Sequence, residues 1–238
     1  KHIYLYDNED KPTYEDILKE FSKQVSVIHI PYNNRKKPIQ FRILKHFKQN
    51  YMYTNNNTHV IHMDIDEFIC LKKHSCIRNF IEEYINGSCY GIGINWKFFG
   101  SSGHRKKSSE PVTQRFTKCQ QGGNWHVKTL FSIEHVNCLG IHNVSYNDNL
   151  GWTQSTNGNK IPKAFNKGNI DQSIIQLNHY KCKTWEEFQY IRTRGRADFN
   201  ENKQPLCELK KSFDSVDKND EEDVTAKLFY QQLLKKKI

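Results

Sequence analysis

The sequence lacks the patterns that mark membrane, zinc-binding and repeat proteins. No apolar run approaches the roughly 20 residues of a transmembrane helix, and no signal peptide is visible. The 7 cysteines include no Cys-x-x-Cys pair, and their scatter and odd number fit neither a zinc site nor a dense disulfide framework. No internal repeat is present. We therefore expect mostly reduced thiols and a cytoplasmic location.

The composition predicts a folded and basic protein. The 238 residues suffice for one domain with a sizeable core, alone or with a small appendage. An aromatic share of 13% argues against disorder, although the mean hydropathy is -0.83. The net charge of +10 attracts anions in general, including nucleic acid, a membrane surface or a phosphorylated substrate. Because a Lys- and Asn-rich composition also arises from an AT-rich genome, charge alone selects none of these partners.

Strand and helix patterns alternate in the first half of the chain. Strand-like runs occupy residues 2–6, 25–30, 59–63 and 90–96, and helical patterns occupy residues 13–24, 39–51 and 76–85. Further strand-like runs follow near residues 113–119, 126–133 and 138–146, and a capping box at Thr184 opens a helix that should end near Gly195. The alternation predicts an α/β fold with a mostly parallel central sheet flanked by helices. In such sheets, ligands bind at the carboxyl ends of the strands.

A carboxylate pair follows the third strand-like run. Asp64 and Asp66 come directly after the apolar residues 60–63, and in extended chain both side chains project to one side. Two carboxylates this close repel each other unless a cation neutralises them, and oxygen ligands favour Mg²⁺ or Mn²⁺ bridging to a phosphate. Such an ion acts as a Lewis acid on a departing diphosphate. Glu67 points to the opposite side of an extended chain, which favours a structural role over that of a third ligand.

Four segments carry a resemblance to a known family. They are His2–Asn8 with its Tyr-Asp-Asn end, His62–Phe68 with the Asp-x-Asp motif, Trp96–His104 with its Gly-Ser loop, and Asn178–Tyr180 followed by Glu-Glu-Phe and Arg-Gly. In this order they resemble the GT-A glycosyltransferases grouped with family 92 and the glycosyl transferase family 2-like sequences, including viral and bacterial members. The likeness spans most of residues 1–200, which we predict to be the GT-A domain. Residues 201–238 lie outside it as a charged, partly helical extension.

The resemblance implies a GT-A fold and a metal-dependent sugar transfer with inversion at the anomeric carbon. The implied donor is a nucleotide-sugar, with a UDP-sugar as the first choice, and the implied acceptor is a glycan, glycoprotein or other hydroxyl. Mn²⁺ or Mg²⁺ is the implied cofactor, and no nucleic-acid partner is expected. Members usually have one more strand and helix before the Tyr-Asp-Asn strand, so the base pocket either lies outside this chain or is built differently. Because the chain opens at Lys1 rather than at a Met, a Golgi-lumenal location also stays open.

Three further residues join the acid pair as metal or donor candidates. His179, in the Asn-His-Tyr block, is the candidate third metal ligand beside Asp64 and Asp66, and the alternative is a histidine packed at a strand end. Lys128 lies inside a strand pattern and offsets phosphate charge as a point cation, unless it faces solvent. Asp7 contacts the ribose or base of the donor, unless it caps the next loop. Asp64 belongs to the donor site as well.

The candidate acceptor residues are Trp96, Ser102, Gly103 and His104. They lead into or form a loop after a strand, and aromatic faces suit the apolar C–H faces of sugars. The polar segment 147–169, which we predict to be a flexible loop or lid, completes this site. The competing interpretations are core packing for Trp96 and a solvated loop tip for His104.

A transfer with inversion needs a general base that takes the proton of the acceptor hydroxyl. Asp171, just after the polar segment, is the first candidate, and Glu134 and His104 are alternatives. A carboxylate at a helix N-terminus is an equally good interpretation of Asp171. His142 lies on an alternating strand pattern and fits a structural or acceptor-facing position better than a ligand position.

Two other classes of protein compete with a glycosyltransferase. Phosphohydrolases of the haloacid-dehalogenase type also place Asp-x-Asp after an apolar strand, but they need Thr or Val where this chain has Phe68. A basic nucleic-acid-binding module is compatible with the charge, although no RRM, KH or zinc-knuckle pattern occurs. Turnover of a generic phosphate ester favours the first, and a salt-sensitive gel shift unaffected by a chelator favours the second.

Overall fold

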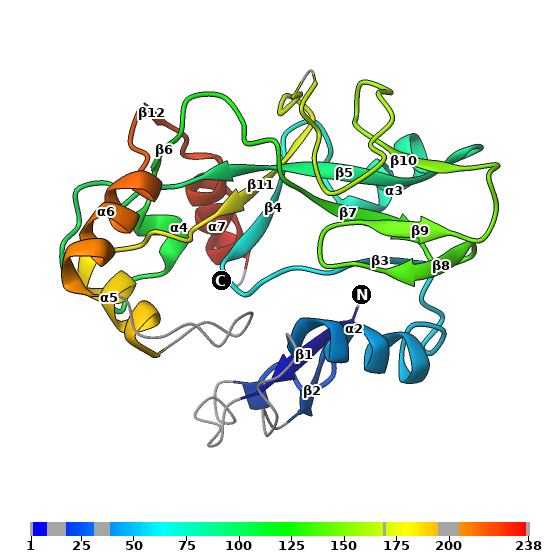
Figure 1. The fold of residues 1–238 in the computed structure, drawn as a ribbon, viewed down its shortest axis with the longest axis horizontal. Helices are drawn as coiled ribbons and strands as arrows, with labels where there is room; N and C mark the ends of the chain where they lie inside the picture. The colour runs from blue at the N-terminus through cyan, green and yellow to red at the C-terminus, as the bar shows by residue number, and fades with distance from the viewer. Residues whose placement is uncertain (1, 9–17, 31–38, 169, 195–204, 237–238) are drawn as a thin grey trace.

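The computed structural model in Figure 1 describes residues 2–8, 18–30, 39–168, 170–194 and 205–236. Its elements, in chain order, are β1 (Ile3–Asp7), β2 (Val25–His29), α2 (Ile39–Asn50), β3 (His59–Ile61), β4 (Glu67–Leu71), α3 (Ile77–Tyr84), β5 (Cys89–Phe98), α4 (Val112–Arg115), β6 (Lys118–Cys119), β7 (Val127–Ser132), β8 (Val136–Leu139), β9 (Val144–Tyr146), β10 (Trp152–Gln154), β11 (Ile175–His179), α5 (Trp185–Arg194), α6 (Leu206–Val216), β12 (Glu221–Glu222) and α7 (Thr225–Lys236). The helix predicted over residues 13–24 lies partly outside the described ranges. The predicted end at Gly195 of the helix that begins near Thr184 also lies outside them. The strand predicted near residues 113–119 is wrong in its first half, which forms α4.

The central sheet is mixed. Its strand order is β3-β7-β5-β11-β4, and β10 pairs along β5. The pairs β3/β7, β5/β7 and β4/β11 are antiparallel, whereas β5/β11 and β5/β10 are parallel. The α/β class is therefore confirmed, but the mostly parallel sheet is not what these strands form. β7 follows β5 without a long helix between them and pairs with it antiparallel, whereas β11 pairs parallel with β5 only after the long connection through residues 99–174.

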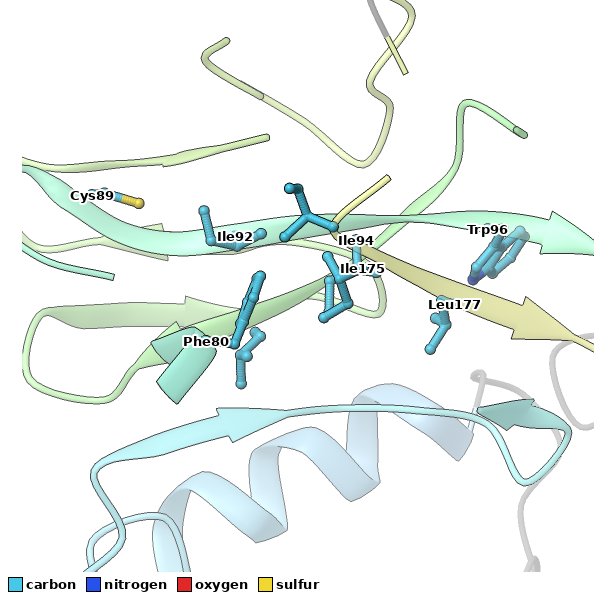
Figure 2. Packing of buried hydrophobic residues seen from close by; sticks show 9 residues of the cluster. Phe80, Cys89, Ile92, Ile94, Trp96, Ile175 and Leu177 are labelled. Atoms are coloured by element: carbon cyan, nitrogen blue, oxygen red, sulfur yellow. The ribbon is translucent and has the colours of Figure 1, made fainter. Parts of the chain in front are cut away.

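β5 and β11 lie at the centre of the core. Figure 2 shows Phe80 of α3 with Ile92 and Ile94 of β5, and with Ile175 and Leu177 of β11, in one buried cluster. β5 is buried along nearly its whole length, as expected of a strand covered on both faces. Burial of these apolar side chains fixes the ends of β5 and β11, where several of the candidate site residues lie.

The N-terminal elements form a small unit below the central sheet in Figure 1. β1 and β2 pair in parallel as a separate two-stranded sheet. The ring of Tyr4 on β1 lies 5.4 Å from that of Phe47 on α2, and the hydroxyl of Tyr6 lies 3.0 Å from Nδ1 of His46. Phe47 also belongs to a buried cluster with Phe131 of β7, so α2 connects this unit to the central sheet.

The predicted C-terminal extension packs onto the rest of the chain. β12 pairs antiparallel with β6, and α6 shares a buried cluster with α5 that contains Phe188 and Phe213. Nζ of Lys97 on β5 lies 2.6 Å from Oε1 of Glu221, and Nε2 of Gln176 on β11 donates to Oδ2 of Asp223 at 2.8 Å. Charged residues that read as an extension in the sequence thus supply the partners of polar side chains on the central sheet.

Candidate active site

Three strands of the central sheet end at one edge. β3 and β5 both run antiparallel to β7, and β11 runs parallel to β5, so the carboxyl ends of β3, β5 and β11 lie together. β3 and β4 stand at opposite ends of the strand order, and residues 62–66 cross this edge to join them (Figure 1). Asp64, Asp66 and His179 therefore share the edge at which α/β sheets bind ligands.

The acid pair lies on a tight turn rather than in extended chain. The N–H of Glu67 donates to the carbonyl of Asp64 at 3.0 Å, and the N–H of Asp64 donates to Oε2 of Glu67 at 2.9 Å. These bonds close a turn with Ile65 and Asp66 at its corners, and Ile65 is 82% exposed. The predicted alternation of Asp64 and Asp66 along a strand is therefore wrong, because the turn sets their directions.

A buried lysine lies behind this turn. Nζ of Lys128 donates to Oδ2 of Asp64 at 3.0 Å and lies 3.7 Å from Oε2 of Glu67, while Nε2 of Gln40 donates to Oδ1 of Asp64 at 3.2 Å. The Lys128 side chain is 0% exposed, whereas that of Asp64 is 38% exposed. The solvent-facing alternative for Lys128 is therefore wrong, because β7 holds the ammonium beneath the turn, and its role in offsetting phosphate charge stays a prediction. Its positive charge pairs with the carboxylate of Asp64.

Glu67 is the buried acid that ties the turn together. Burial raises the pKa of Glu67 to about 8, and the charge of Lys128 offsets this rise only in part. Glu67 therefore holds a proton at neutral pH. Its Oε1 is buried and has no hydrogen-bond partner among the residues described. Both features agree with the structural role that the sequence suggested for Glu67.

Asp66 and His179 face each other at the end of β11. The N–H of Tyr180 donates to the carbonyl of Asp66 at 2.9 Å, which extends the ladder between β4 and β11 by one residue. Nε2 of His179 lies 3.6 Å from Oδ1 of Asp66, with side chains that are 7% and 25% exposed. Burial raises the pKa of Asp66, but the contact with His179 and the charge of Lys183 outweigh this effect and lower it overall. Asp66 is therefore a carboxylate at neutral pH.

Packing, rather than a hydrogen bond, orients the His179 ring. Its centroid lies 4.4 Å from that of Trp96 and 5.4 Å from that of Phe98, both on β5. Its Nδ1 is buried without a hydrogen-bond partner in the described part of the chain. The aromatic neighbours thus hold Nε2 toward Asp66.

The spacing of this pair fits a divalent cation. The 3.6 Å between Nε2 and Oδ1 exceeds the roughly 2.8 Å of a charge-assisted hydrogen bond. Two adjacent ligands each about 2.1 Å from one octahedral ion are about 3 Å apart, so Nε2 and Oδ1 need to approach by only about half an ångström to share an ion. No group of three or more His, Cys, Asp or Glu in the described residues has metal-binding geometry. A sparse protein contribution still suits Mg²⁺-like ions, which commonly take one or two carboxylates together with substrate phosphates.

Two neutral histidines lie close to Lys128. The Nδ1–H of His142 donates to the carbonyl of Val127 at 3.0 Å, and the Nδ1–H of His62 donates to that of Ile141 at 3.3 Å. Burial, and then the charge of Lys128, lowers the pKa of both imidazoles. Each therefore carries its lone pair on Nε2 at neutral pH. The cavity beside them measures about 10 Å³, which is room for a water molecule but not for a sugar.

The predicted bases are not brought to the acid pair. Asp171 precedes β11, on the side where the N–H of Lys72 donates to the carbonyl of Ile174 at 2.9 Å. Asp66 lies at the other end of this strand pair, and the length of β4 alone corresponds to about 13 Å. Glu134 follows the end of β7, which is likewise opposite the acid pair, and its side chain is 78% exposed. The structure thus gives neither carboxylate a geometric link to the site.

The predicted acceptor loop packs against the C-terminal segment. The N–H of Ser102 donates to Oδ1 of Asn219 at 2.8 Å, and the Nε2–H of His104 donates to the carbonyl of Arg115 at 3.0 Å. Gly103 is exposed and has a φ of 82°, in the left-handed region that favours glycine. These contacts make the loop part of the fold, and its role at an acceptor stays a prediction.

Trp96 and Asp7 are both buried. Trp96 is 7% exposed within the central core cluster, so core packing, the alternative interpretation, describes its side chain. Asp7 is 6% exposed at the end of β1, and its Oδ2 lies 3.2 Å from Nδ1 of His29. Contact of Asp7 with a nucleotide stays a prediction.

Sequence reasoning missed some residues of this edge. Gln40 is the second residue of α2 and reaches Asp64, and no pattern links two residues that are 24 positions apart. His126 stacks on Trp96 with centroids 4.9 Å apart, and it too was not singled out. In the sequence, histidines recur next to apolar or aromatic residues at the candidate strand ends, and this signal could have identified His126.

One comparison with known proteins places the chain in a class of enzyme. A family model described as glycosyltransferase family 92 matches residues 1–226. The chain therefore belongs to glycosyltransferase family 92, which indicates a transferase that acts on a sugar donor and an acceptor. A search of the curated proteins found no match. In the described part of the chain, no helix is both long and apolar enough to cross a membrane.

Proposed function

We propose that this protein moves a sugar from a nucleotide-sugar donor, with a UDP-sugar as the first choice, to a hydroxyl of a glycan or glycoprotein. The transfer inverts the anomeric carbon and depends on Mn²⁺ or Mg²⁺ bound by Asp66 and His179. The observation that carries the proposal is the 3.6 Å spacing of this carboxylate and imidazole at the carboxyl edge of the sheet in a family 92 member. The family match also favours this function over a phosphohydrolase or a nucleic-acid-binding module.

The surrounding residues support this role. When bound, the cation neutralises the charge that develops on the departing diphosphate. Lys128 and Gln40 hold both oxygens of Asp64, which keeps the turn in one geometry, and the packing of Trp96 and Phe98 keeps the His179 ring in place. Such preorganisation means that little reorientation is needed when a substrate arrives.

The reaction exchanges one bond for another at the anomeric carbon. The acceptor oxygen bonds to this carbon while the bond from the carbon to the diphosphate oxygen breaks, and the hydroxyl proton passes to a base or to solvent. The nucleoside diphosphate leaves with the bonding electron pair. We assign the fold to the GT-A type as part of this proposal, on the basis of the sequence resemblance and the site at the carboxyl edge.

Calorimetry of nucleoside diphosphate binding tests the proposal. UDP, GDP and CDP are titrated with and without Mn²⁺ into the wild-type protein and into Asp66→Asn. We expect one nucleotide to bind only with the metal, and the variant to lose at least about tenfold in affinity because it loses one of two protein ligands. Asp214→Asn, an exposed acid on α6, is the matched control and should bind like the wild type.

Two results would contradict the proposal. One is metal-independent binding with an affinity that Asp66→Asn leaves unchanged. The other is the absence of nucleoside diphosphate release from every member of a panel of sugar nucleotides supplied with Mn²⁺ and a mixture of free glycans. Circular dichroism spectra of the variants establish that a loss of binding does not come from unfolding.

A further inference from the structure

Two large aromatic side chains are exposed near the candidate site. Trp125 is 51% exposed and Phe165 is 42% exposed. They belong to neighbouring segments, because the N–H of Asn166 donates to the carbonyl of Trp125 at 2.8 Å and His126 forms an antiparallel bridge with Phe165. Exposed aromatic rings on adjacent segments offer apolar faces on which a ligand can pack.

The backbone beneath these aromatics is firmly held. Nδ2 of Asn166 donates to Oδ1 of Asn95 at 3.0 Å, and Nδ2 of Asn95 donates to the carbonyl of Asn124 at 2.9 Å. Asn95 and Asn166 are only 4% and 5% exposed. In the sequence, Trp125 directly follows Asn124 and Phe165 directly precedes Asn166, so each ring is next to a residue of this hydrogen-bonded series. The aromatics are therefore presented from a rigid base, which lowers the entropy lost when a ligand binds.

A continuous series of ring contacts joins this surface to the proposed metal pair. The rings of Phe165 and His126 lie 4.9 Å apart, and His126 stacks on Trp96 at 4.9 Å with an interplanar angle of 18°. Trp96 in turn contacts His179 at 4.4 Å, and Nε2 of His179 lies 3.6 Å from Asp66. The exposed ring of Phe165 is thus three ring contacts away from His179.

The chemistry of this surface suits a sugar ring. A pyranose has an apolar face of C–H groups that packs on an aromatic ring, and its hydroxyls need polar partners at the side. Nζ of Lys167 lies 5.7 Å from the centroid of the Trp125 ring, where an ammonium can donate to such a hydroxyl. Burial lowers the pKa of His126 to about 4, so the ring that supports Phe165 is neutral at working pH.

We propose that Trp125 and Phe165 form the platform on which a sugar ring of the acceptor stacks. The proposal rests on the glycosyltransferase function proposed above and deepens it by naming the residues that hold the acceptor sugar. It moves the acceptor contact from the Trp96–His104 loop, whose Ser102 and His104 are engaged within the fold, to the exposed rings beside it.

A hollow elsewhere on the protein provides the competing sugar site. It measures about 310 Å³ and is lined by Tyr146, Trp152 and Lys160 among others, with Nζ of Lys160 3.4 Å from the centroid of the Trp152 ring. Trp152 pairs with Cys89 at the start of β5, whereas Trp96 lies near its end. Trp152 therefore lies on the order of 20 Å from Trp96 along β5. The hollow also reaches Pro162, three residues before Phe165, so the two sites are told apart by which tryptophan responds.

Fluorine NMR with fluorotryptophan makes this distinction. The chain has 4 tryptophans, whose signals are assigned by single Trp→Phe substitutions. Methyl glycosides of galactose, glucose, mannose and N-acetylglucosamine are titrated into the protein with UDP and Mn²⁺ present. We expect the Trp125 signal to shift, with Trp185, packed against Phe213 in the C-terminal cluster, as the internal reference that stays constant. A shift at Trp152 alone, or none at Trp125 with any glycoside, overturns the proposal.

Variants add a kinetic readout. Trp125→Ala and Phe165→Ala should each raise the KM for the acceptor about tenfold, which corresponds to one stacking contact, while kcat and the donor KM change less than about twofold. Trp125→Phe should restore most of the acceptor affinity. Phe229→Ala, which removes a ring that is 58% exposed on α7, is the matched control and should leave the acceptor KM unchanged.

The outcomes separate this proposal from the one on which it rests. If the wild type binds UDP with Mn²⁺ but the two alanine variants keep the acceptor KM, the platform is wrong and the glycosyltransferase function stands. If the wild type binds no nucleoside diphosphate and transfers no sugar, the function itself fails and the platform with it. Unchanged thermal midpoints of the exposed-site variants show that the fold is intact.

Discussion

Replacing Asp223 by asparagine removes the charge that joins the C-terminal segment to the central sheet. The carboxylate is 8% exposed and lies 3.6 Å from Nζ of Lys72 and 3.7 Å from Nζ of Lys97. It also accepts hydrogen bonds from Nε2 of Gln176 at 2.8 Å and from the N–H of Thr225 at 2.9 Å. The asparagine side chain is isosteric, so the change tests charge and acceptor capacity rather than volume.

The expected loss in the free energy of unfolding follows from the pKa of Asp223. Burial raises it, but the hydrogen bonds from Thr225 and Gln176 and the charge of Lys72 outweigh this effect and lower the pKa from 3.8 to about 2. A lowered pKa stabilises the fold above the unfolded value of 3.8, and this stability is lost as pH falls through 2. The shift corresponds to about 2 kcal/mol at pH 7, of which roughly half remains at pH 3.

Urea denaturation at pH 7 and pH 3 measures this contribution. Asp223→Asn should lower the free energy of unfolding by about 2 kcal/mol at pH 7 and by about half as much at pH 3. Asp220→Asn, an exposed acid three residues earlier, should change it by less than about 0.5 kcal/mol. A loss in Asp223→Asn that is the same at both pH values would refute the electrostatic reasoning.

Two further substitutions follow from close approaches and distances. Gly100→Ala should lower the thermal midpoint by several degrees, because its Cβ would collide with the carbonyl oxygen of Lys218. Gly168→Ala is the control and should be neutral, because its Cβ meets only an ordinary contact at 3.7 Å. Equal midpoints of the two variants by calorimetry would contradict this packing. Asp171→Asn should keep kcat within about twofold, because Asp171 lies at the end of β11 opposite Asp66. A loss of about a hundredfold in a donor-release assay would instead identify Asp171 as the base.

Local pattern located most elements but not their pairing. The strands β1, β2, β3, β5 and β7 and the helices α2 and α3 fall within one to three residues of their predicted ranges, because hydrophobic periodicity is a local property. The antiparallel pairing of β5 with β7 depends on which faces are buried against each other, and the sequence contains no such long-range information. The predicted mostly parallel sheet failed for this reason.

The same limit applies to the candidate site. Asp64 and Asp66 were predicted at the end of a strand, and the family resemblance added His179 to them; the structure brings all three to one edge. Their exact arrangement was not predictable, because Glu67 closes a turn that the alternation of residues 64–66 does not reveal. Lys128 reads as a strand residue in the sequence, and only the strand order places its ammonium behind that turn.

Pulsed electron paramagnetic resonance of bound Mn²⁺ tests the central claim most directly. The spectrum of the wild-type protein with Mn²⁺ and UDP should contain a ¹⁴N coupling from the His179 imidazole and a ³¹P coupling from the diphosphate. His179→Ala should lose the nitrogen coupling, and Asp66→Asn should weaken metal binding while the protein stays folded. A phosphorus coupling with no nitrogen coupling in the wild type would contradict a cation held between His179 and Asp66.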